Sequence, residues 1–407
     1  MPYSTEPSIS DAQNYILPAM PFDQVLDSLI TSLEQVKGDA VRRYFQDDSP
    51  NAYQNSSKIT RWAVYALLAD LNLWKGNWDE AINYCDQVID FKRQQYQEML
   101  EREGNVNDIA LIDSIPMILE KPLGSTVCGH AYDEIFGAGN SFESIFELYF
   151  NNDNTWVGNY YGNSQNVMGR LSCPDFIAKE VAQGNGTIFK RTDGRAYEST
   201  VSSNSSYAIA KYTRQAVSYD TKNVSTEKDL KLIESRRSSD DANWIFYRLS
   251  DIVLMRAEAM SQLATTQEEL LESVQAIREI FKRSNPYAYA NTNNHANTDS
   301  LNTDFFSTSN EMLEALVMAE RQREFVGEGK RWFDLVRFAQ RKGNTAKMFD
   351  TYLGRKYGDN KVAVKSKLST ITSLFMPVHR DDMSANPLLH QNSVWNTSES
   401  TSKTDKL

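Results

Sequence analysis

The sequence has few of the residues from which metal and catalytic sites are usually built. Its three cysteines, Cys85, Cys128 and Cys173, lie far apart and form no CxxC pair, which argues against a disulfide framework and a cysteine-based zinc site. The four histidines form neither an HxxxH pattern nor a His–Cys pair with zinc-site spacing. No G-x-S-x-G elbow, P-loop or GxGxxG motif is present, which weighs against hydrolases, kinases and dinucleotide-binding enzymes.

Positive charge and long apolar runs are also scarce. With 43 basic and 54 acidic residues the formal net charge is −11, and no basic patch contains interleaved aromatics. Neither nucleic acid nor an anionic lipid surface is therefore an expected partner. No apolar stretch approaches the roughly 18–20 residues that span a bilayer. The first ten residues have neither the basic nor the apolar region of a secretion signal.

Helical periodicity is present in several separate segments. Apolar residues at steps of three and four predict an amphipathic helix within residues 12–37. Two helices are predicted between Lys58 and Phe91, with a turn at Gly76, and this arrangement resembles one tetratricopeptide (TPR) unit. Small residues would let these helices approach closely, and the buried faces are expected to include Ile59, Ala66, Ala69, Ala81 and Cys85.

Two further helix pairs are predicted, at 243–264 with 267–282 and at 310–326 with 330–341. The middle of the chain, about 100–240, is rich in Asn, Ser, Gly and Tyr and mostly lacks helical periodicity. Short strands are expected there at 142–150 and 207–213. Loops this long inside a compact domain usually carry function. The polar tail at 393–407 is expected to be disordered.

Three segments resemble the signatures of the SusD/RagB family, in the family's order. They are Tyr247–Ala259, Glu320–Arg337, and Phe375–His379 with Asn386–Asn392. The resemblance implies a mostly α fold, in which TPR-like helix pairs form a scaffold and long irregular insertions form the ligand face. It implies a single domain over residues 1–392, with the ligand face near 100–240.

The same resemblance implies a function. Family members are outer-membrane lipoproteins on the surface of Bacteroidota that capture oligosaccharides, or in some cases peptides. They act as a lid on a SusC-like TonB-dependent transporter. We therefore expect a cell-surface protein that binds an oligosaccharide or polysaccharide, without catalysis, cofactor or metal. Family members begin with a lipidated Cys and a long N-terminal region, so a lipid anchor is expected from residues not present in this chain.

The leading candidate for the ligand site is the stretch 151–163. Its aromatic side chains offer flat surfaces for the C–H faces of a sugar, and its amides offer partners for hydroxyls. The candidate residues are Asn154, Trp156, Asn159, Tyr160 and Tyr161. The alternative is that these aromatics pack back onto the scaffold.

Further ligand candidates are Arg195, Tyr197 and Tyr287, in two other irregular segments. An arginine fork could bind a carboxylate or paired hydroxyls. The alternative is that these loops contact the transporter. A calcium site around Asp153 is not expected, because no EF-hand spacing supports it.

The charged segment Glu320–Arg337 allows two interpretations. Its carboxylates, among them Glu324 and Glu328, could be acid–base residues. The alternative, which we favour, is that Glu320, Arg323 and Glu324 lie on one helix face and pair within it and with Arg331 across a glycine turn. Gly327 and Gly329 would then end one helix and permit the next. Two other classes also stay open: a TPR scaffold for peptides or proteins, and a helical glycosidase. The latter needs two carboxylates ~5–10 Å apart, and no motif singles out such a pair.

Overall fold

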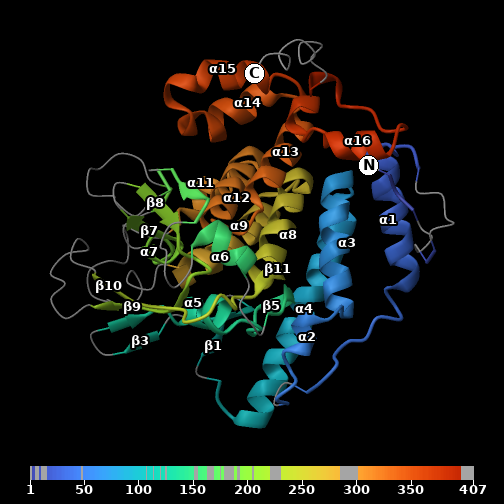
Figure 1. Ribbon diagram of the computed structural model, residues 1–407. Helices are drawn as coiled ribbons and strands as arrows, with labels where there is room; N and C mark the ends of the chain where they lie inside the picture. The colour runs from blue at the N-terminus through green and yellow to red at the C-terminus, as the bar shows by residue number, and fades with distance from the viewer. Residues whose placement is uncertain are drawn as a thin grey trace. The chain divides into compact units, whose positions relative to one another are not determined.

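The computed structural model describes residues 2–4, 9–10, 16–46, 49–106, 108–112, 114–119, 121–123, 126–150, 155–162, 169–174, 176–177, 188–189, 193–203, 206–220, 231–284 and 301–395 (Figure 1). The chain divides into two compact units, one of residues 1–32 with 330–407 and one of residues 33–329. The single domain expected over residues 1–392 stays a prediction.

The first predicted helical hairpin is present in the larger unit. It consists of α3 (Arg61–Lys75) and α4 (Trp78–Glu103), and Gly76 ends α3 with a left-handed backbone, φ +81°. Ala66, Ala69, Ala81 and Cys85 are all completely buried, as predicted. Helix α4 continues well beyond the predicted end at Phe91.

The start of this hairpin differs from the prediction. The side chain of Thr60 accepts a hydrogen bond from the backbone N–H of Ala63, which caps α3 and fixes its start at Arg61. Ile59 therefore lies before the helix and is 62% exposed, so its predicted place on the buried face is wrong.

The other long helices of this unit are linked to the hairpin through α8. Helix α8 (Leu249–Leu263) contacts α4, α9 (Gln267–Ser284) and α12 (Asn310–Glu324). Figure 1 shows α8 beside α3, with α9 and α12 on the other side of α8. The short helices α2 (Gln54–Ser57) and α11 (Thr303–Phe306) lie at their margins. The predicted helices at 267–282 and 310–326 are thus confirmed.

The predicted start of the helix at 243–264 is wrong, because the helix begins at Leu249. Trp244–Arg248 forms strand β11, which pairs antiparallel with β5 (Ser144–Leu148). Ile245, expected on a helix face, is buried in this two-stranded sheet. The segment contains aromatic and β-branched residues, which favour a strand once β5 pairs with it.

Short antiparallel strands make up much of the middle of the chain, and Figure 1 shows β3 and β7–β10 gathered on one side of the helices. Strand β5 confirms the prediction at 142–150, whereas only 207–209 of the predicted 207–213 is strand, because residues 210–213 leave the sheet. Strands β1 (Ile109–Ile112) and β2 (Ile115–Ile118) form a hairpin. A four-stranded sheet has the order β10 (Lys231–Arg236), β9 (Arg214–Asp220), β4 (Thr126–Cys128), β3 (Lys121–Leu123). A three-stranded sheet has the order β6 (Ser172–Cys173), β8 (Ser206–Ile209), β7 (Thr200–Ser203). Between the strands lie α5 (His130–Tyr132), a π-helical turn (Asp133–Ala138), α6 (Thr155–Tyr161) and α7 (Arg195–Ser199).

The smaller unit is also helical. Helix α1 (Phe22–Val36) begins in it and is shorter than the predicted 12–37, because residues 16–20 are not helical and Pro21 precedes the first turn. The predicted helix at 330–341 is α13 (Arg331–Lys342), and the indole N–H of Trp332 donates to the carbonyl of Leu374 at 3.2 Å. The rest of this unit comprises α14 (Thr345–Met348), α15 (Lys361–Lys367), α16 (Arg380–Ala385) and short π or 3₁₀ turns at Phe349–Leu353, Gly354–Lys356, Gly358–Asn360, Ile371–Leu374 and Ser393–Trp395.

The predicted fold class, mostly α with TPR-like helix pairs and irregular insertions, is confirmed. Within the described part of the chain, no helix has both the length and the apolar character that a membrane crossing requires.

Candidate functional site

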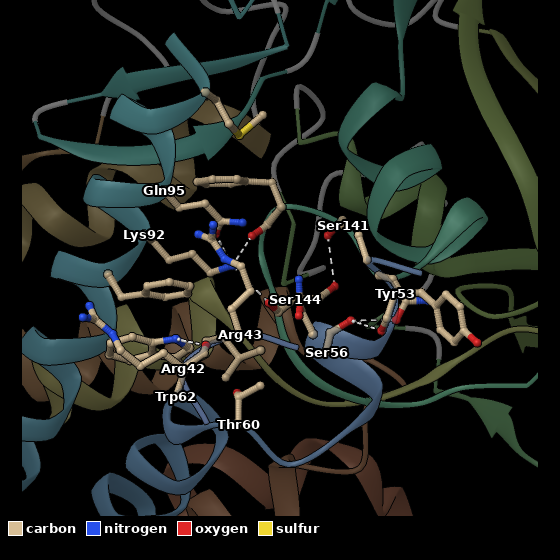
Figure 2. A pocket seen from close by; sticks show the side chains of 17 residues that line it. Arg42, Arg43, Tyr53, Ser56, Thr60, Trp62, Lys92, Gln95, Ser141 and Ser144 are labelled. Carbon is tan, nitrogen blue, oxygen red and sulfur yellow. Dashed lines mark hydrogen bonds between the residues drawn. The ribbon is translucent and has the colours of Figure 1, made fainter. Parts of the chain in front are cut away.

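The larger unit contains a cavity of about 210 Å³ beside the first helical hairpin. We call it the hairpin pocket. Its walls come from residues 42–43 and 52–62, the middle of α4, and residues 140–145. Its 17 lining residues are Arg42, Arg43, Ala52, Tyr53, Asn55, Ser56, Thr60, Trp62, Phe91, Lys92, Gln95, Met99, Asn140, Ser141, Phe142, Ser144 and Ile145 (Figure 2).

One wall of the hairpin pocket is built on a stacked pair of aromatic rings. Trp62, in the first turn of α3, lies against Phe91 of α4 with ring centroids 4.0 Å apart and planes inclined by 11°. The indole N–H of Trp62 donates to the backbone carbonyl of Arg42 at 2.8 Å. The guanidinium of Arg42 in turn lies over the Trp62 ring, 5.5 Å from its centroid. The hairpin therefore fixes both the aromatic wall and the segment that carries Arg42.

The opposite wall combines an aromatic ring with small polar groups, and Figure 2 shows Tyr53 and Ser141 across the pocket from Trp62. Tyr53 stacks on Tyr149 with ring centroids 4.6 Å apart, and Tyr149 is 43% exposed. The hydroxyl of Ser56 donates to the side-chain oxygen of Asn140 at 2.7 Å. This contact joins two pocket segments that lie far apart in the sequence.

The loop before α3 is held by one amide side chain. Asn55 accepts hydrogen bonds from the backbone N–H groups of Tyr44 and Phe45, at 2.8 and 3.0 Å, and donates to the carbonyl of Phe45 at 2.8 Å. These three bonds tie residues 44–45 to Asn55 and so help to set the position of the adjacent Arg42 and Arg43.

The sequence-predicted site at 151–163 is only partly described. Its residues 155–161 form helix α6, not a loop. Asn159 and Tyr160 are exposed, whereas Tyr161 is buried. The hydroxyl of Tyr161 donates to the carbonyl of Gly327 at 2.8 Å, and its ring contacts Tyr212 and Trp244. Tyr161 therefore packs onto the scaffold, which is the alternative that the sequence left open.

The other predicted site residues lie apart from the hairpin pocket or outside the described residues. The side chains of Trp156 and Tyr197, and all of Asn154 and Tyr287, are outside the described residues. Arg195 is buried, and the carboxylates that it binds belong to the protein: Asp193, Glu320 and Glu324, each within 2.9 Å.

Arg195 is part of a larger group of buried charges, which we call the buried ionic cluster. It comprises Glu143, Asp193, Arg195, Lys211, Arg248, Arg283, Glu320, Glu324 and Glu328. Burial raises the pKa of Glu324, but Arg283, Arg248 and Arg195 outweigh it and hold that pKa well below its usual range. The cavity beside this cluster is only about 30 Å³, which suits water better than a sugar.

The buried ionic cluster shows how the first carboxylates of the 320–337 segment are paired. Glu320 pairs with Arg323 in the same helix at 2.6 Å, as predicted, and Glu324 pairs with arginines from three distant segments. Gly327 and Gly329 both have positive φ, at +78° and +76°, as a helix end followed by a new start requires. Across the described residues, no group of three or more His, Cys, Asp or Glu side chains is arranged to hold a metal ion.

The hairpin pocket was not predicted from the sequence, because its walls come from separate segments and none of them alone contains a recognisable binding motif. One signal was present. The polar stretch before α3 contains Arg42, Arg43, Tyr44, Phe45 and Tyr53, a concentration of basic and aromatic residues that helical periodicity does not explain.

Known proteins resemble this chain in sequence and in fold. A model of the SusD family matches residues 141–395, more than half of the chain. The SusD-like protein P38 of Formosa agariphila is 34% identical over 116 residues, which are 27% of this chain and 21% of that protein. The match thus spans only about a fifth of the length of this curated relative.

Solved structures share the fold. A SusD superfamily protein of Bacteroides thetaiotaomicron is 19% identical with a TM-score of 0.55, and the match covers 95% of this chain and 71% of that one. Surface glycan-binding protein A of Bacteroides uniformis is 17% identical with a TM-score of 0.54, over 97% of this chain and 73% of that one. At these identities the likeness concerns the fold.

Proposed function

The chain belongs to the SusD family, and we propose that it is a non-catalytic protein that captures a glycan at the cell surface. The observation that carries this proposal is the hairpin pocket, where the stacked rings of Trp62 and Phe91 stand beside basic and hydroxyl groups. Sites of this kind combine an apolar wall with a few polar groups that orient the ligand. The family and the name of the glycan-binding relative from Bacteroides uniformis support the same function.

The size of the hairpin pocket indicates how a glycan would bind. Pockets that enclose a drug-sized ligand measure roughly 300–1,000 Å³, and this one measures about 210 Å³. We therefore propose that one sugar unit enters the pocket while its neighbours lie over Tyr53 and the exposed Tyr149. Asn159 and Tyr160 on α6 form a second candidate contact, since solvent reaches both.

The lining of the pocket favours capture over cleavage. A glycosidase needs two facing carboxylates, and none of the described residues lining the pocket is Asp or Glu. We propose that the captured glycan passes to a SusC-like TonB-dependent transporter in the outer membrane, and that a lipid anchor holds the protein there. Family membership supports this part of the proposal.

The test is binding of the chain to a panel of neutral and acidic polysaccharides by affinity electrophoresis, followed by calorimetry with oligosaccharides. Tyr53→Ala should weaken binding roughly 5–10-fold, because an aromatic stack contributes about 1 kcal/mol. Tyr160→Ala is the matched aromatic variant on α6. Loss of binding with Tyr160→Ala alone would move the site to α6. Release of reducing ends from any bound polysaccharide would show that the protein is an enzyme.

A further inference from the structure

The hairpin pocket differs in charge from the rest of the protein. The chain has more acidic than basic residues and a net charge of −11. The pocket lining reverses this balance: it includes Arg42, Arg43 and Lys92, and none of its described residues is Asp or Glu. A concave surface lined by one sign of charge concentrates ligands of the opposite sign.

Two of the three cations are engaged with the protein. Lys92 is buried, and its ammonium group donates to the carbonyls of Phe142 and Ser144 and to the side chain of Gln95. Lys92 thus adds positive charge to the pocket lining, while its N–H groups form hydrogen bonds within the protein. Arg43 forms an ion pair with Glu98 at 3.1 Å, which offsets part of its charge.

Arg42 differs from the other two. Its side chain is exposed, and within the described residues its guanidinium has one long hydrogen bond, to Gln94 at 3.4 Å, besides its position over Trp62. Among the described residues, most of its five N–H donors have no acceptor. The Trp62 ring restrains the guanidinium at the edge of the pocket, which reduces the entropy lost when an anion binds.

We propose that the hairpin pocket is selective for an anionic sugar unit, one that carries a carboxylate or a sulfate ester, and that Arg42 binds the anionic group. This inference rests on the proposed glycan capture and specifies its ligand. The planar fork of Arg42 matches the paired oxygens of either group. Lys92, which also lines the pocket, adds positive charge, and Tyr53 contacts a neighbouring sugar unit.

The test uses two pairs of polysaccharides that differ only in charge: polygalacturonate with its methyl ester, and a sulfated galactan with its desulfated form. The anionic member of at least one pair should bind at least about 10-fold more tightly than the neutral member, as expected for a hydrogen bond between charged groups. Raising NaCl from 50 to 500 mM should reduce this difference. The pair that shows the difference identifies the anionic group.

Arg42→Gln should remove the preference while thermal unfolding changes little, since the side chain is exposed and its hydrogen bond to Gln94 is long. Arg102→Gln is the matched control, because it removes the same charge from an exposed site on α4 outside the pocket. Equal binding of both members of each pair, or unchanged binding of the anionic member to Arg42→Gln, would overturn the inference.

The outcomes separate this inference from the function on which it rests. If neutral glycans bind, Tyr53→Ala weakens them and charge has no effect, capture stands and selectivity for anions is wrong. If neither charged nor neutral glycans bind the folded chain, both proposals are wrong.

Discussion

Arg195 and Glu324 are 129 residues apart in the sequence, yet a guanidinium nitrogen of one lies 2.7 Å from a carboxylate oxygen of the other, and both side chains are buried. Arg195 begins α7 in the middle of the chain, and Glu324 ends α12 in the scaffold. The pair therefore attaches an irregular insertion to the helices. It also gives Glu324, in the most charged of the three signature segments, a contact that stabilises the fold.

Glu324→Gln should destabilise the protein strongly. The carboxylate forms ion pairs with Arg195, Arg248 and Arg283, and a buried charge that loses its partner typically costs about 3–5 kcal/mol. Urea unfolding measures the loss. Glu272→Gln is the control, because Glu272 is exposed and its pair with Arg256 should contribute less than about 1 kcal/mol. Similar losses for the two variants would contradict this prediction.

Asp133→Asn should stabilise the protein at pH 7 and have little effect at pH 4. Burial raises the pKa of Asp133 from 3.8 to about 6. A hydrogen bond from the Val217 N–H acts to lower this pKa, and the charge of Glu134 acts to raise it. A carboxyl with a raised pKa contributes stability that is full below pH 3.8 and is lost as the pH rises through 6. An Asn at this position does not titrate.

The gain from Asp133→Asn between pH 4 and pH 7 should be on the order of 1–2 kcal/mol, allowing for solvent screening at this half-buried site. The measurement is the unfolding free energy of both proteins across this pH range. A difference between them that does not change with pH would show that the carboxyl titrates normally.

Tyr161→Phe should cost about 1 kcal/mol of stability, the usual net contribution of one hydrogen bond, because its hydroxyl donates to the Gly327 carbonyl. Glycan affinity should be unchanged. Tyr160→Phe, at the exposed neighbouring position, should change stability by less than about 0.5 kcal/mol. Weaker glycan binding by Tyr161→Phe would indicate that the Tyr161 hydroxyl contacts the glycan.

Gly327→Ala should destabilise more than Gly104→Ala. Both glycines have positive φ, +78° and +72°, so both alanines carry the same backbone strain of roughly 1–2 kcal/mol. A Cβ at Gly327 would lie 2.7 Å from a methyl carbon of Ile209, whereas a Cβ at Gly104 meets nothing within 4 Å. Thermal unfolding should show an additional loss of about 1 kcal/mol or more at Gly327. Equal losses would mean that Ile209 moves aside freely.

The scaffold could be predicted from the sequence because its signals are local. Apolar residues at helical spacing, with Gly76 between two helices, predict α3 and α4 without reference to the rest of the chain. The Gly327–Gly329 turn was predicted for the same reason. These features depend on neighbouring residues, so one segment contains all the information they need.

Strand β11 could not be predicted because its partner is distant. The Trp244–Arg248 segment continues the helical spacing of α8, and only pairing with β5 turns it into a strand. The hairpin pocket was missed for a related reason. Trp62 and Phe91 read as apolar positions of a helix pair, and Arg42 becomes significant only when the fold places it over Trp62.

The candidate site at 151–163 shows the limit of composition as a guide. Tyr160 and Tyr161 are adjacent and identical, yet one is exposed and the other is buried with a scaffold hydrogen bond. On a helix, neighbouring side chains point in directions about 100° apart, so only the orientation of α6 decides which one solvent reaches.

The order of residues in the buried ionic cluster bears on how the protein is made. The two carboxylates that pair with Arg248, Glu324 and Glu328, both follow it in the chain. During synthesis from the N-terminus, Arg248 cannot be neutralised in a closed core until α12 and the residues after it have been added. The part of the core that contains Arg248 and Arg283 must therefore wait for the last quarter of the chain, and a nascent chain that stops before α12 should stay open there to chaperones and proteases.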